Sequence, residues 1–243
     1  MKTVRLDRRL VELGLAIGRE EASVLIASGR VRVDGVPTTR ALGQVQAHRA
    51  VTLAPSTHTW VSRGALKLLG AFQDLDVVVT DRVCADLGAS TGGFTEVLLH
   101  GGARRVYAVD VGHNLLHERI RTDERVVVLD GTNVRHLDAL PEPIDVIVGD
   151  LSFIGWASVL PVVHRLLTPT GNAVLLVKPQ FEVPRQSVAP GGRVRDSAAR
   201  LAAIDRVAAS ARTAGFEVSA GVDARVAGAR AGNVEHFLHL RPR

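Results

Sequence analysis

The chain has 243 residues, of which 46% are hydrophobic, 23% are charged and 4% are aromatic, and its net charge is +5. This length fits one large domain, or one ordinary domain with a small one, and the composition is that of a globular protein with a sizeable core. Residues 1–9 are charged with no apolar run behind them, and no apolar run approaches the ~20 residues of a membrane span, so neither a signal peptide nor a membrane segment is expected.

The single cysteine, Cys84, cannot form an internal disulfide, which favours a reducing, cytoplasmic location. The positive charge is unevenly placed. Residues 1–60 contain nine Lys or Arg and five Asp or Glu, whereas the remaining residues contain twenty-one and twenty. Excess base in the first quarter is typical of a nucleic-acid-binding domain, although a solvated basic surface would look the same.

The first sixty residues predict two short helices followed by short strands. Apolar residues recur at helical spacing in residues 6–13 and in "REEASVLIASGR" (19–30), and Gly14 and Gly29 follow as helix stops. "VRVDGVP" (31–37) predicts a strand and a turn at Asp34-Gly35, and "AVTLA" (50–54) predicts a further strand.

Arginines accompany both helices. Two short basic helices followed by "SGRVRVDG" (28–35) resemble the small RNA-binding domain first named for ribosomal protein S-four. This resemblance implies recognition of structured RNA by its backbone and shape, which suits arginines that seek phosphates. The arginines predicted to contact RNA are Arg5, Arg8, Arg19, Arg30, Arg32, Arg63 and Arg193. Of these, Arg63 lies on the next helix, and Arg193 lies in a basic, glycine-bearing loop at 186–196.

Residues 58–61 are predicted to link a small α+β RNA-binding domain (1–57) to a second domain (62–243), in which strands and helices alternate. Such alternation predicts a Rossmann-like, doubly wound α/β fold with a mostly parallel sheet of seven strands. The last strand follows its predecessor without room for a helix, so we expect it to be antiparallel. Strands are predicted at 83–87, 105–109, 126–129, 144–148, 173–177, 216–222 and 234–240, and helices at 63–75, 93–100, 115–120, 156–167 and 197–214.

The stretch "VCADLGASTGGF" (83–94) predicts a strand, a glycine-rich turn and the start of a helix. Glycines there let backbone N–H groups approach a ligand at the helix N-terminus. A G-x-G-x-x-G dinucleotide fingerprint is excluded, because position 90 is serine. The stretch resembles the cofactor loop of S-adenosylmethionine-dependent methyltransferases, in which an acidic residue near the first turn faces the methionine ammonium. The residues so assigned are Asp86, Gly88, Ser90, Thr91, Gly92 and Gly93.

The next two predicted strands also end in polar residues. "YAVDVG" places Asp110 where a carboxylate can accept hydrogen bonds from ribose hydroxyls, and "VVVLDGTN" places Asp130 or Asn133 near the adenine. Taken singly, Asp86 would also fit a helix cap and Asp110 a turn. Their combination on successive strands favours a nucleoside cofactor, S-adenosylmethionine.

Ionisable residues converge on the same edge of the predicted sheet. Asp150 ends the fourth strand, and Lys178 ends the fifth, where Pro179 disfavours helical geometry for the lysine. Glu235 begins the antiparallel last strand, so it starts at the edge where its neighbours end, and open α/β sheets bind ligands at that edge. Lys67, on the helix before the first strand, would by itself be read as an exposed lysine whose stem covers the surface.

Lysine is scarce: three of the thirty Lys and Arg residues are lysine, which leaves twenty-seven arginines. A desolvated lysine can lose its proton and act as a base, whereas an arginine stays charged. Lysines at 67 and 178 therefore indicate a reaction that removes a proton from a weakly acidic hydroxyl.

The set Lys67, Asp150, Lys178 and Glu235 resembles the tetrad of FtsJ-like ribose 2′-O-methyltransferases. With the arginine-rich first domain, the whole chain resembles the TlyA family of rRNA (cytidine-2′-O)-methyltransferases, whose members are also known as haemolysin A. The stretches that carry this resemblance are "SRGALKL", "DLGASTGGFTEVLL", "DLSFI", "LLVKPQFE", "PGGRVRD" and "GNVEHFL".

The resemblance implies that Lys178 is the base on the 2′-hydroxyl, that Asp150 and Lys67 position the hydroxyl and tune the lysine, and that Glu235 completes the charge network. It implies rRNA or a ribosomal subunit as partner. In the residues themselves no metal cluster is visible, and neither a membrane nor an obligate protein partner is expected. 23S rRNA is favoured over 16S rRNA because the chain ends directly after its last strand, as the family's shorter form does. The linker departs from the family's Arg-x-Trp-Val, because His58 replaces the arginine.

Other activities were weighed against these residues. Methylation at carbon five of a pyrimidine needs a cysteine nucleophile, and Cys84 lies inside a predicted buried strand. Enzymes that methylate an exocyclic amine usually carry the motif Asn/Asp-Pro-Pro-aromatic after the fourth strand, where this chain has Asp150-Leu-Ser-Phe. A membrane-lytic protein would need a longer amphipathic cationic helix. A non-catalytic RNA-binding or assembly factor stays open, and it would tolerate Lys178→Arg.

Overall fold

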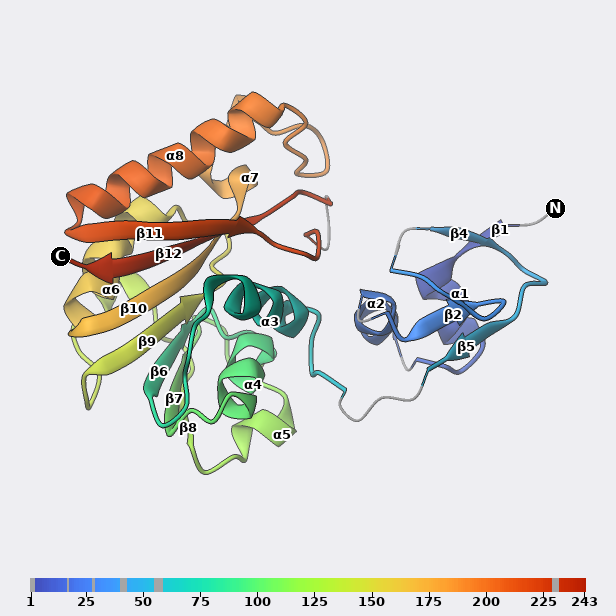
Figure 1. The fold of residues 1–243 in the computed structure, drawn as a ribbon, viewed down its shortest axis with the longest axis horizontal. Coiled ribbons are helices and arrows are strands. Elements are labelled where there is room, and N and C mark those ends of the chain that lie inside the picture. Colours follow the sequence, from blue (N-terminus) through green and yellow to red (C-terminus); the bar gives the residue numbers. More distant parts are fainter. Residues whose placement is uncertain (1–2, 17, 28, 40–42, 55–58, 229–231) are drawn as a thin grey trace. The chain divides into compact units, whose positions relative to one another are not determined.

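The computed structural model describes residues 3–16, 18–27, 29–39, 43–54, 59–228 and 232–243. The chain divides into two compact units, residues 1–67 and 68–243. The predicted linker, 58–61, begins at His58, which lies outside the described residues. The contacts within the chain thus place the division inside the helix that follows the linker, and the two units are described in turn (Figure 1).

The first unit is a small α+β fold. Two short helices, α1 (Leu6–Glu12) and α2 (Arg19–Ala27), pack on two small sheets. In the first sheet β1 (Thr3–Arg5) pairs with β4 (Gln44–Gln46), and in the second β2 (Val31–Val33) lies between β3 (Val36–Pro37) and β5 (Val51–Leu53). Asp34 and Gly35 have φ of 50° and 81°, so they form the turn between β2 and β3 that an Asp-Gly pair favours.

Both helices of this unit were predicted, because their apolar residues meet in one core. That core consists of Leu6, Leu10, Ala16, Ala22, Leu25, Ile26, Val31, Val33, Val45 and Val51. The strands β1 and β4 were not predicted, because β1 runs directly into α1 and β4 has a single apolar residue between two glutamines.

The second unit contains the predicted seven-stranded sheet, in the order β11-β12-β10-β9-β6-β7-β8. The strand β12 pairs antiparallel with both β10 and β11, and the pairs β10-β9, β9-β6, β6-β7 and β7-β8 are parallel, which confirms the predicted fold class. The strands are β6 (Val83–Leu87), β7 (Arg105–Val109), β8 (Val126–Leu129), β9 (Ile144–Gly149), β10 (Leu167–Val177), β11 (Phe216–Asp223) and β12 (His236–Pro242).

The helices of the sheet differ from prediction mainly at their ends. They are α3 (Gly64–Leu75), α4 (Gly93–His100), α5 (Glu118–Arg121), α6 (Leu160–Leu166), α7 (Pro179–Glu182) and α8 (Ser197–Thr213), with 3₁₀ turns at Val134–His136, Trp156–Ser158 and Arg185–Ser187. The helix predicted at 156–167 is wrong in its first turn: residues 156–158 form a 3₁₀ turn, and α6 begins only where Pro161 can occupy its first turn.

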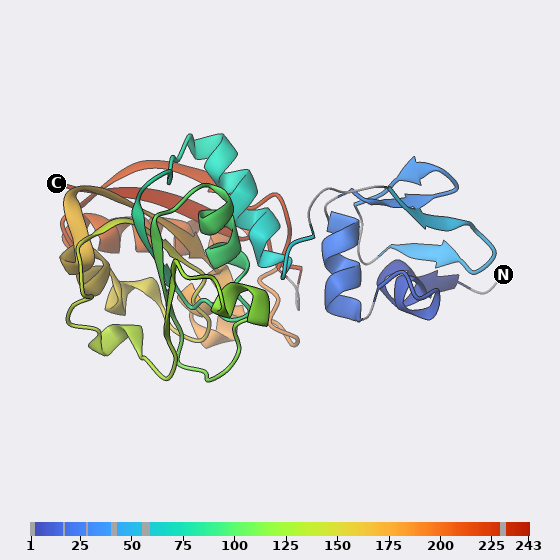
Figure 2. The ribbon, with the colours of Figure 1, turned by 90° about the horizontal axis from the view of Figure 1, so that it is seen from below.

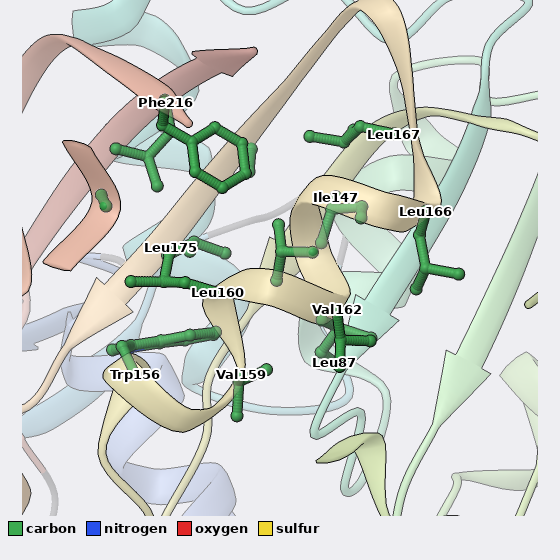
Figure 3. Close-up of a cluster of buried hydrophobic side chains, with 14 of the residues drawn as sticks. Leu87, Ile147, Trp156, Val159, Leu160, Val162, Leu166, Leu167, Leu175 and Phe216 are labelled. Carbon is green, nitrogen blue, oxygen red and sulfur yellow. The ribbon is translucent and has the colours of Figure 1, made fainter. Parts of the chain in front are cut away.

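The sheet has helices on both faces. On one face, Leu87, Ile147 and Leu175 belong to a buried cluster with Trp156 and with the apolar residues of α6 and α8 (Figure 3). On the other face Phe94 of α4 packs against Phe237 of β12, with ring centroids 6.0 Å apart, and the figures show α3 and α4 side by side (Figure 1 and Figure 2). Because helices cover both faces of the sheet, we expect a ligand of this unit to bind at the edge where the parallel strands end.

Candidate active site

The central strands of the sheet end at one level. In the pairing register, Gly149 of β9 lies beside both Leu87 of β6 and Leu175 of β10. The antiparallel strand β12 begins at this edge too, since its first residue, His236, pairs with Val177, the last residue of β10. Asp150, Lys178 and Glu235 are the next residues beyond these ends, so they leave the sheet at the same edge.

Lys178 and Asp150 form an ion pair at this edge. The Lys178 Nζ atom lies 2.5 Å from Asp150 Oδ1, and the two side chains are only 12% and 24% exposed. Lys178 has extended φ and ψ of −103° and 105°, and it immediately precedes α7, whose first residue is Pro179. The lysine therefore follows β10 rather than ending it, and the proline directly after it begins a short helix that was not predicted.

A third polar group completes this cluster. Lys178 Nζ donates a hydrogen bond of 2.9 Å to Ser152 Oγ. Sequence reasoning did not select Ser152, although it stands two residues after Asp150 in a stretch already chosen for the family resemblance. The serine and the aspartate hold the ammonium between them, so its position is fixed by groups on the neighbouring loop.

Glu235 and Lys67 are the other two residues of the predicted tetrad. Both side chains are buried, with 2% and 6% exposure. Glu235 lies directly before β12, and a Cβ atom on Gly228 would come within 2.7 Å of its Oε1 atom, so a larger residue at position 228 would require the glutamate side chain to shift. Lys67 lies in the first turn of α3. The structure shows the pair Lys178–Asp150, and the participation of all four residues in one reaction is a proposal.

The glycine-rich turn after β6 has the backbone that its sequence predicts. Gly88, Ser90 and Gly92 have φ of 86°, 49° and 92°, and Gly92 precedes α4 in the left-handed conformation. A Cβ atom on Gly88 would lie 3.0 Å from the Asp150 carbonyl oxygen. Glycine at position 88 therefore allows the turn after β6 to lie directly beside the residue that carries the ion pair.

Asp86 offers a buried acceptor under this turn. The residue is fully buried, its Oδ2 accepts a 2.7 Å hydrogen bond from Thr95 Oγ1, and its Oδ1 has no hydrogen-bond partner among the described residues. Burial raises the pKa of Asp86 to about 7, against the opposing hydrogen bond from Thr95. A buried carboxylate oxygen without a donor fits a cationic group such as an ammonium.

The other predicted cofactor residues lie along the same edge. Asp110 follows β7, and its carboxylate accepts hydrogen bonds from the backbone N–H groups of Ser90 (2.8 Å) and Gly112 (2.7 Å). It thereby ties the glycine-rich turn to the next loop, and a carboxylate with about four acceptor positions keeps room for ribose hydroxyls. Thr91 is exposed, whereas Gly93 is buried at the start of α4.

Asp130 has partners within the protein. Its Oδ2 accepts hydrogen bonds from the Asn114 N–H group (3.0 Å) and from Arg121 (2.7 Å). The backbone hydrogen bond from Asn114 and the nearby guanidinium outweigh desolvation, so the pKa of Asp130 is lowered. Asn133 accepts a hydrogen bond from the Arg135 N–H group at the start of a 3₁₀ turn. Both polar groups thus support the loops around the predicted adenine position.

An exposed aromatic residue stands next to the ion pair. Phe153 is 82% exposed and has a φ of 65°, which is unusual for a bulky residue. Its ring packs against that of Phe181 with centroids 5.1 Å apart, and Lys178 Nζ lies 6.0 Å from the Phe181 centroid. Strained backbone that presents an aromatic ring to solvent is more typical of a binding site than of packing.

Asn233 connects three segments around this edge, and it was also not predicted. Its side-chain amide donates to Gln180 Oε1 and to the Gly192 carbonyl, both at 2.9 Å, and its Oδ1 accepts from the Val194 N–H group at 3.0 Å. The predicted basic loop is therefore a hydrogen-bonded turn in which Ala189 pairs with Arg193. The signal that could have identified Asn233 was its place in "GNVEHFL".

The arginines predicted to bind RNA have different surroundings. Arg5 and Arg19 both contact Asp7, and Arg8 lies 3.2 Å from Glu12 while its side chain stays 72% exposed. Arg30 donates to the Ala54 carbonyl and to Thr59, and Arg32 is an exposed residue of β2. Arg63 immediately precedes α3, and Arg193 belongs to the turn held by Asn233.

These features define the class of the protein: a Rossmann-like enzyme domain whose ligand-binding edge carries a lysine–aspartate pair, joined to a small basic domain. Residues 60–241 match the model of the FtsJ-like methyltransferase family, and residues 4–41 match that of the S4 domain. The chain therefore belongs to the FtsJ-like methyltransferases, and within them to the TlyA family, as the following relatives show.

The chain is 45% identical over 243 residues to the 16S/23S rRNA (cytidine-2′-O)-methyltransferase TlyA of Mycobacterium tuberculosis (strain CDC 1551 / Oshkosh), which covers 99% of this chain and 90% of that protein. It is 37% identical over 124 residues to the 23S rRNA (cytidine-2′-O)-methyltransferase TlyA of Campylobacter jejuni, which covers 51% and 48% of the two chains. Among solved structures, a haemolysin-named protein of Streptococcus thermophilus matches with a TM-score of 0.75 and 34% identity, over 100% of this chain and 89% of that one.

Proposed function

We propose that this enzyme transfers the methyl group of S-adenosylmethionine to the 2′-hydroxyl of a cytidine in ribosomal RNA. The observation that carries the proposal is the Lys178–Asp150–Ser152 cluster at the edge where the sheet binds ligands. It places a lysine, which can release its proton, beside groups that hold it in one position. The M. tuberculosis relative, which covers almost the whole chain, is named for this reaction.

The residues around the glycine-rich turn fit S-adenosylmethionine. The unpartnered Oδ1 of Asp86 suits the methionine ammonium, the turn at 88–93 gives backbone close access, and Asp110 suits the ribose hydroxyls. Asp130 or Asn133 would border the adenine. When bound, S-adenosylmethionine supplies an electrophilic methyl group on a positively charged sulfur.

The protein's task is then proton removal and alignment. Lys178, in its neutral form, accepts the proton of the 2′-hydroxyl on Nζ as the oxygen forms its bond to the methyl carbon. The resulting ammonium is stabilised by Asp150, and Ser152 Oγ accepts one of its hydrogens. S-adenosylmethionine would supply that methyl carbon and leave as S-adenosylhomocysteine. Lys67 and Glu235 would complete the charge network, as the family resemblance implies.

The nucleotide can be held by the exposed ring of Phe153. Sequence-specific RNA recognition commonly stacks an unpaired base on an aromatic side chain. Phe153 lies three residues after Asp150, rests on Phe181 and is 82% exposed, so a base placed on its free face would be near Lys178. The arginines of the S4 domain, with Arg63 and Arg193, would contact the phosphates of the surrounding RNA.

Large-subunit 23S rRNA is the proposed substrate ahead of 16S rRNA. The M. tuberculosis and C. jejuni relatives are both named for 23S rRNA, and only the first is also named for 16S rRNA. Action on ribosomes also agrees with the proposed cytoplasmic location. Within the described part of the chain no helix is long and apolar enough to cross a membrane.

Alternative methyl transfers lack a suitable residue. Burial raises the pKa of the Cys84 thiol to about 12, so its thiolate is absent at neutral pH and a cysteine-dependent attack on a pyrimidine has no nucleophile there.

The test is to incubate the purified full chain and radiolabelled S-adenosylmethionine with unmodified large and small ribosomal subunits, and to locate the product by mass spectrometry of nuclease digests. We expect 2′-O-methylcytidine in 23S rRNA. Label only in 16S rRNA would correct the subunit, whereas a base-methylated product or an unlabelled substrate would refute the proposed reaction.

A further inference from the structure

A buried acidic residue lies in the middle of the basic first unit. Asp7 is only 2% exposed, and its carboxylate is bound by two arginines from different elements. Arg5, at the end of β1, donates from Nε to Oδ1 (3.0 Å) and from Nη2 to Oδ2 (2.7 Å). Arg19, the first residue of α2, donates from Nε (3.3 Å) and Nη2 (3.1 Å) to Oδ2. The Arg8 N–H group donates to Oδ1 at 2.8 Å.

This carboxylate is ionised at neutral pH. Burial opposes its ionisation, but the hydrogen bonds from Arg5, Arg19 and the Arg8 N–H group outweigh burial and lower the pKa of Asp7. The cluster of one carboxylate and two guanidinium groups therefore keeps a net charge of +1. The negative charge faces inward, and the two positive groups are 42% and 64% exposed.

The geometry leaves the outer edge of each arginine available to a ligand. A guanidinium has five N–H donors, and both arginines direct Nε and one Nη2 hydrogen at Asp7. Among the described residues, the hydrogen bonds and ion pairs of the two arginines use Nε and Nη2, and none uses an Nη1 hydrogen. An Nη1–Nη2 edge matches the spacing of two phosphate oxygens, so each arginine can bind a phosphate in a bidentate manner.

We propose that Asp7 is a positioning residue that holds Arg5 and Arg19 as a paired site for phosphates of the RNA backbone. The inference rests on the proposed RNA substrate and adds how the first unit recognises it. Two long side chains lose much rotamer freedom on binding a phosphate, and an internal carboxylate that has already oriented them removes part of that cost.

A positioning role for Asp7 predicts the opposite change in RNA affinity from the one that simple electrostatics predicts. Removal of a negative charge from an RNA-binding unit should strengthen binding if Asp7 acts only through its charge. If Asp7 positions the arginines, Asp7→Asn should weaken binding although the unit becomes more positive. An amide NH₂ in place of Oδ1 cannot accept from Arg5 Nε or the Arg8 N–H group, and an NH₂ in place of Oδ2 cannot accept from Arg19. Asp34→Asn is the matched control: it removes a carboxylate of the same unit, paired with Arg49, at a left-handed position that asparagine tolerates.

The experiment uses the full chain with S-adenosylmethionine and large ribosomal subunits for kinetics, and a fluorescent RNA stem–loop for binding across about 50–200 mM KCl. For Asp7→Asn we expect the KM for subunits to rise about tenfold, kcat and the KM for S-adenosylmethionine to stay unchanged, and the slope of log Kd against log salt to fall by about 1–2. Asp34→Asn should bind as tightly as the unchanged chain, or more tightly.

Equal or tighter RNA binding by a folded Asp7→Asn variant would overturn the inference. If thermal melting shows that this variant does not fold, the double variant R5K/R19K decides instead. It keeps Asp7 and both positive charges but lacks the forked donors, so its RNA affinity should fall by a similar factor, and an unchanged affinity would refute the paired site. Absence of methyl transfer by the unchanged chain would be a separate result, which refutes the proposed function itself.

Discussion

Lys178 and Asp150 meet across two neighbouring parallel strands, with Nζ and Oδ1 2.5 Å apart at a largely buried position. One residue follows β10 and the other follows β9, so the pairing of the strands itself brings the charges together. The attraction alone would be satisfied by an arginine at position 178. What an arginine cannot supply is a nitrogen that can give up its proton and act as a base.

Replacement of Lys178 by arginine should therefore separate charge from basicity. Methyl transfer by K178R is expected to fall about 10²–10⁴-fold, the range that general base catalysis contributes. Binding of S-adenosylmethionine and of rRNA should change by no more than about twofold, because the cation is retained. Single-turnover methylation of large subunits, together with equilibrium binding of both ligands, measures these quantities. Near-normal turnover would show that the site works as an electrostatic clamp and that Lys178 is not the base.

Ser152 should matter less than the lysine that it contacts. Loss of its hydroxyl in S152A removes one hydrogen bond to Lys178 Nζ, and a bond to a charged group is worth about 1.5–3 kcal/mol. The expected result is a decrease in kcat of roughly 10–150-fold with an unchanged KM for S-adenosylmethionine. S152T keeps a hydroxyl and should retain most of the activity. Equal loss in both variants would indicate a steric effect of the substitution rather than loss of the contact.

Phe153 is expected to act on the RNA substrate alone. Removal of a base-stacking ring costs about 1–3 kcal/mol, so F153A should raise the KM for large subunits roughly 5–150-fold. F153W keeps a stacking surface and should stay within a few-fold of the unchanged enzyme. The melting temperature should not fall in either variant, because the ring is 82% exposed. Steady-state kinetics with subunits as the varied substrate measures this, and an unaffected KM in F153A would show that the nucleotide binds elsewhere.

The site residues that could be predicted from the sequence are those that the order and direction of the strands bring to one edge of the sheet. Asp150, Lys178 and Glu235 could be placed together, because parallel strands end at one edge and the last strand had to reverse. Ser152, Thr95 and Asn233 were not selected, since the order of the strands gives no sign of their side-chain contacts with Lys178, Asp86 and Gln180. The strand β10 was predicted from Ala173 but begins at Leu167, because Pro169 and Gly171 hide its first half. The role of Arg5 and Arg19 was read from charge, which gives no sign of the buried Asp7 between them.

Asp86 should make the stability of the ligand-free enzyme depend on pH. Its folded-state pKa of about 7 lies above the value of about 4 expected in the unfolded chain, so folding favours the protonated acid. The stabilising contribution is present in full below about pH 4 and is lost as the pH rises towards 7. A shift of this size corresponds to at most about 4 kcal/mol, because each pKa unit is worth about 1.4 kcal/mol.

The comparison that isolates this effect is D86N, an uncharged residue of the same shape that can still accept from Thr95. Thermal melting between pH 5 and 8 should show the unchanged protein losing stability relative to D86N as the pH rises. Saturating S-adenosylhomocysteine, whose ammonium would pair with the carboxylate, should reduce or reverse that difference in the unchanged protein, and D86N should bind this ligand more weakly. Parallel pH profiles for the two proteins, with and without ligand, would show that Asp86 is neither protonated in the free enzyme nor the partner of the ammonium.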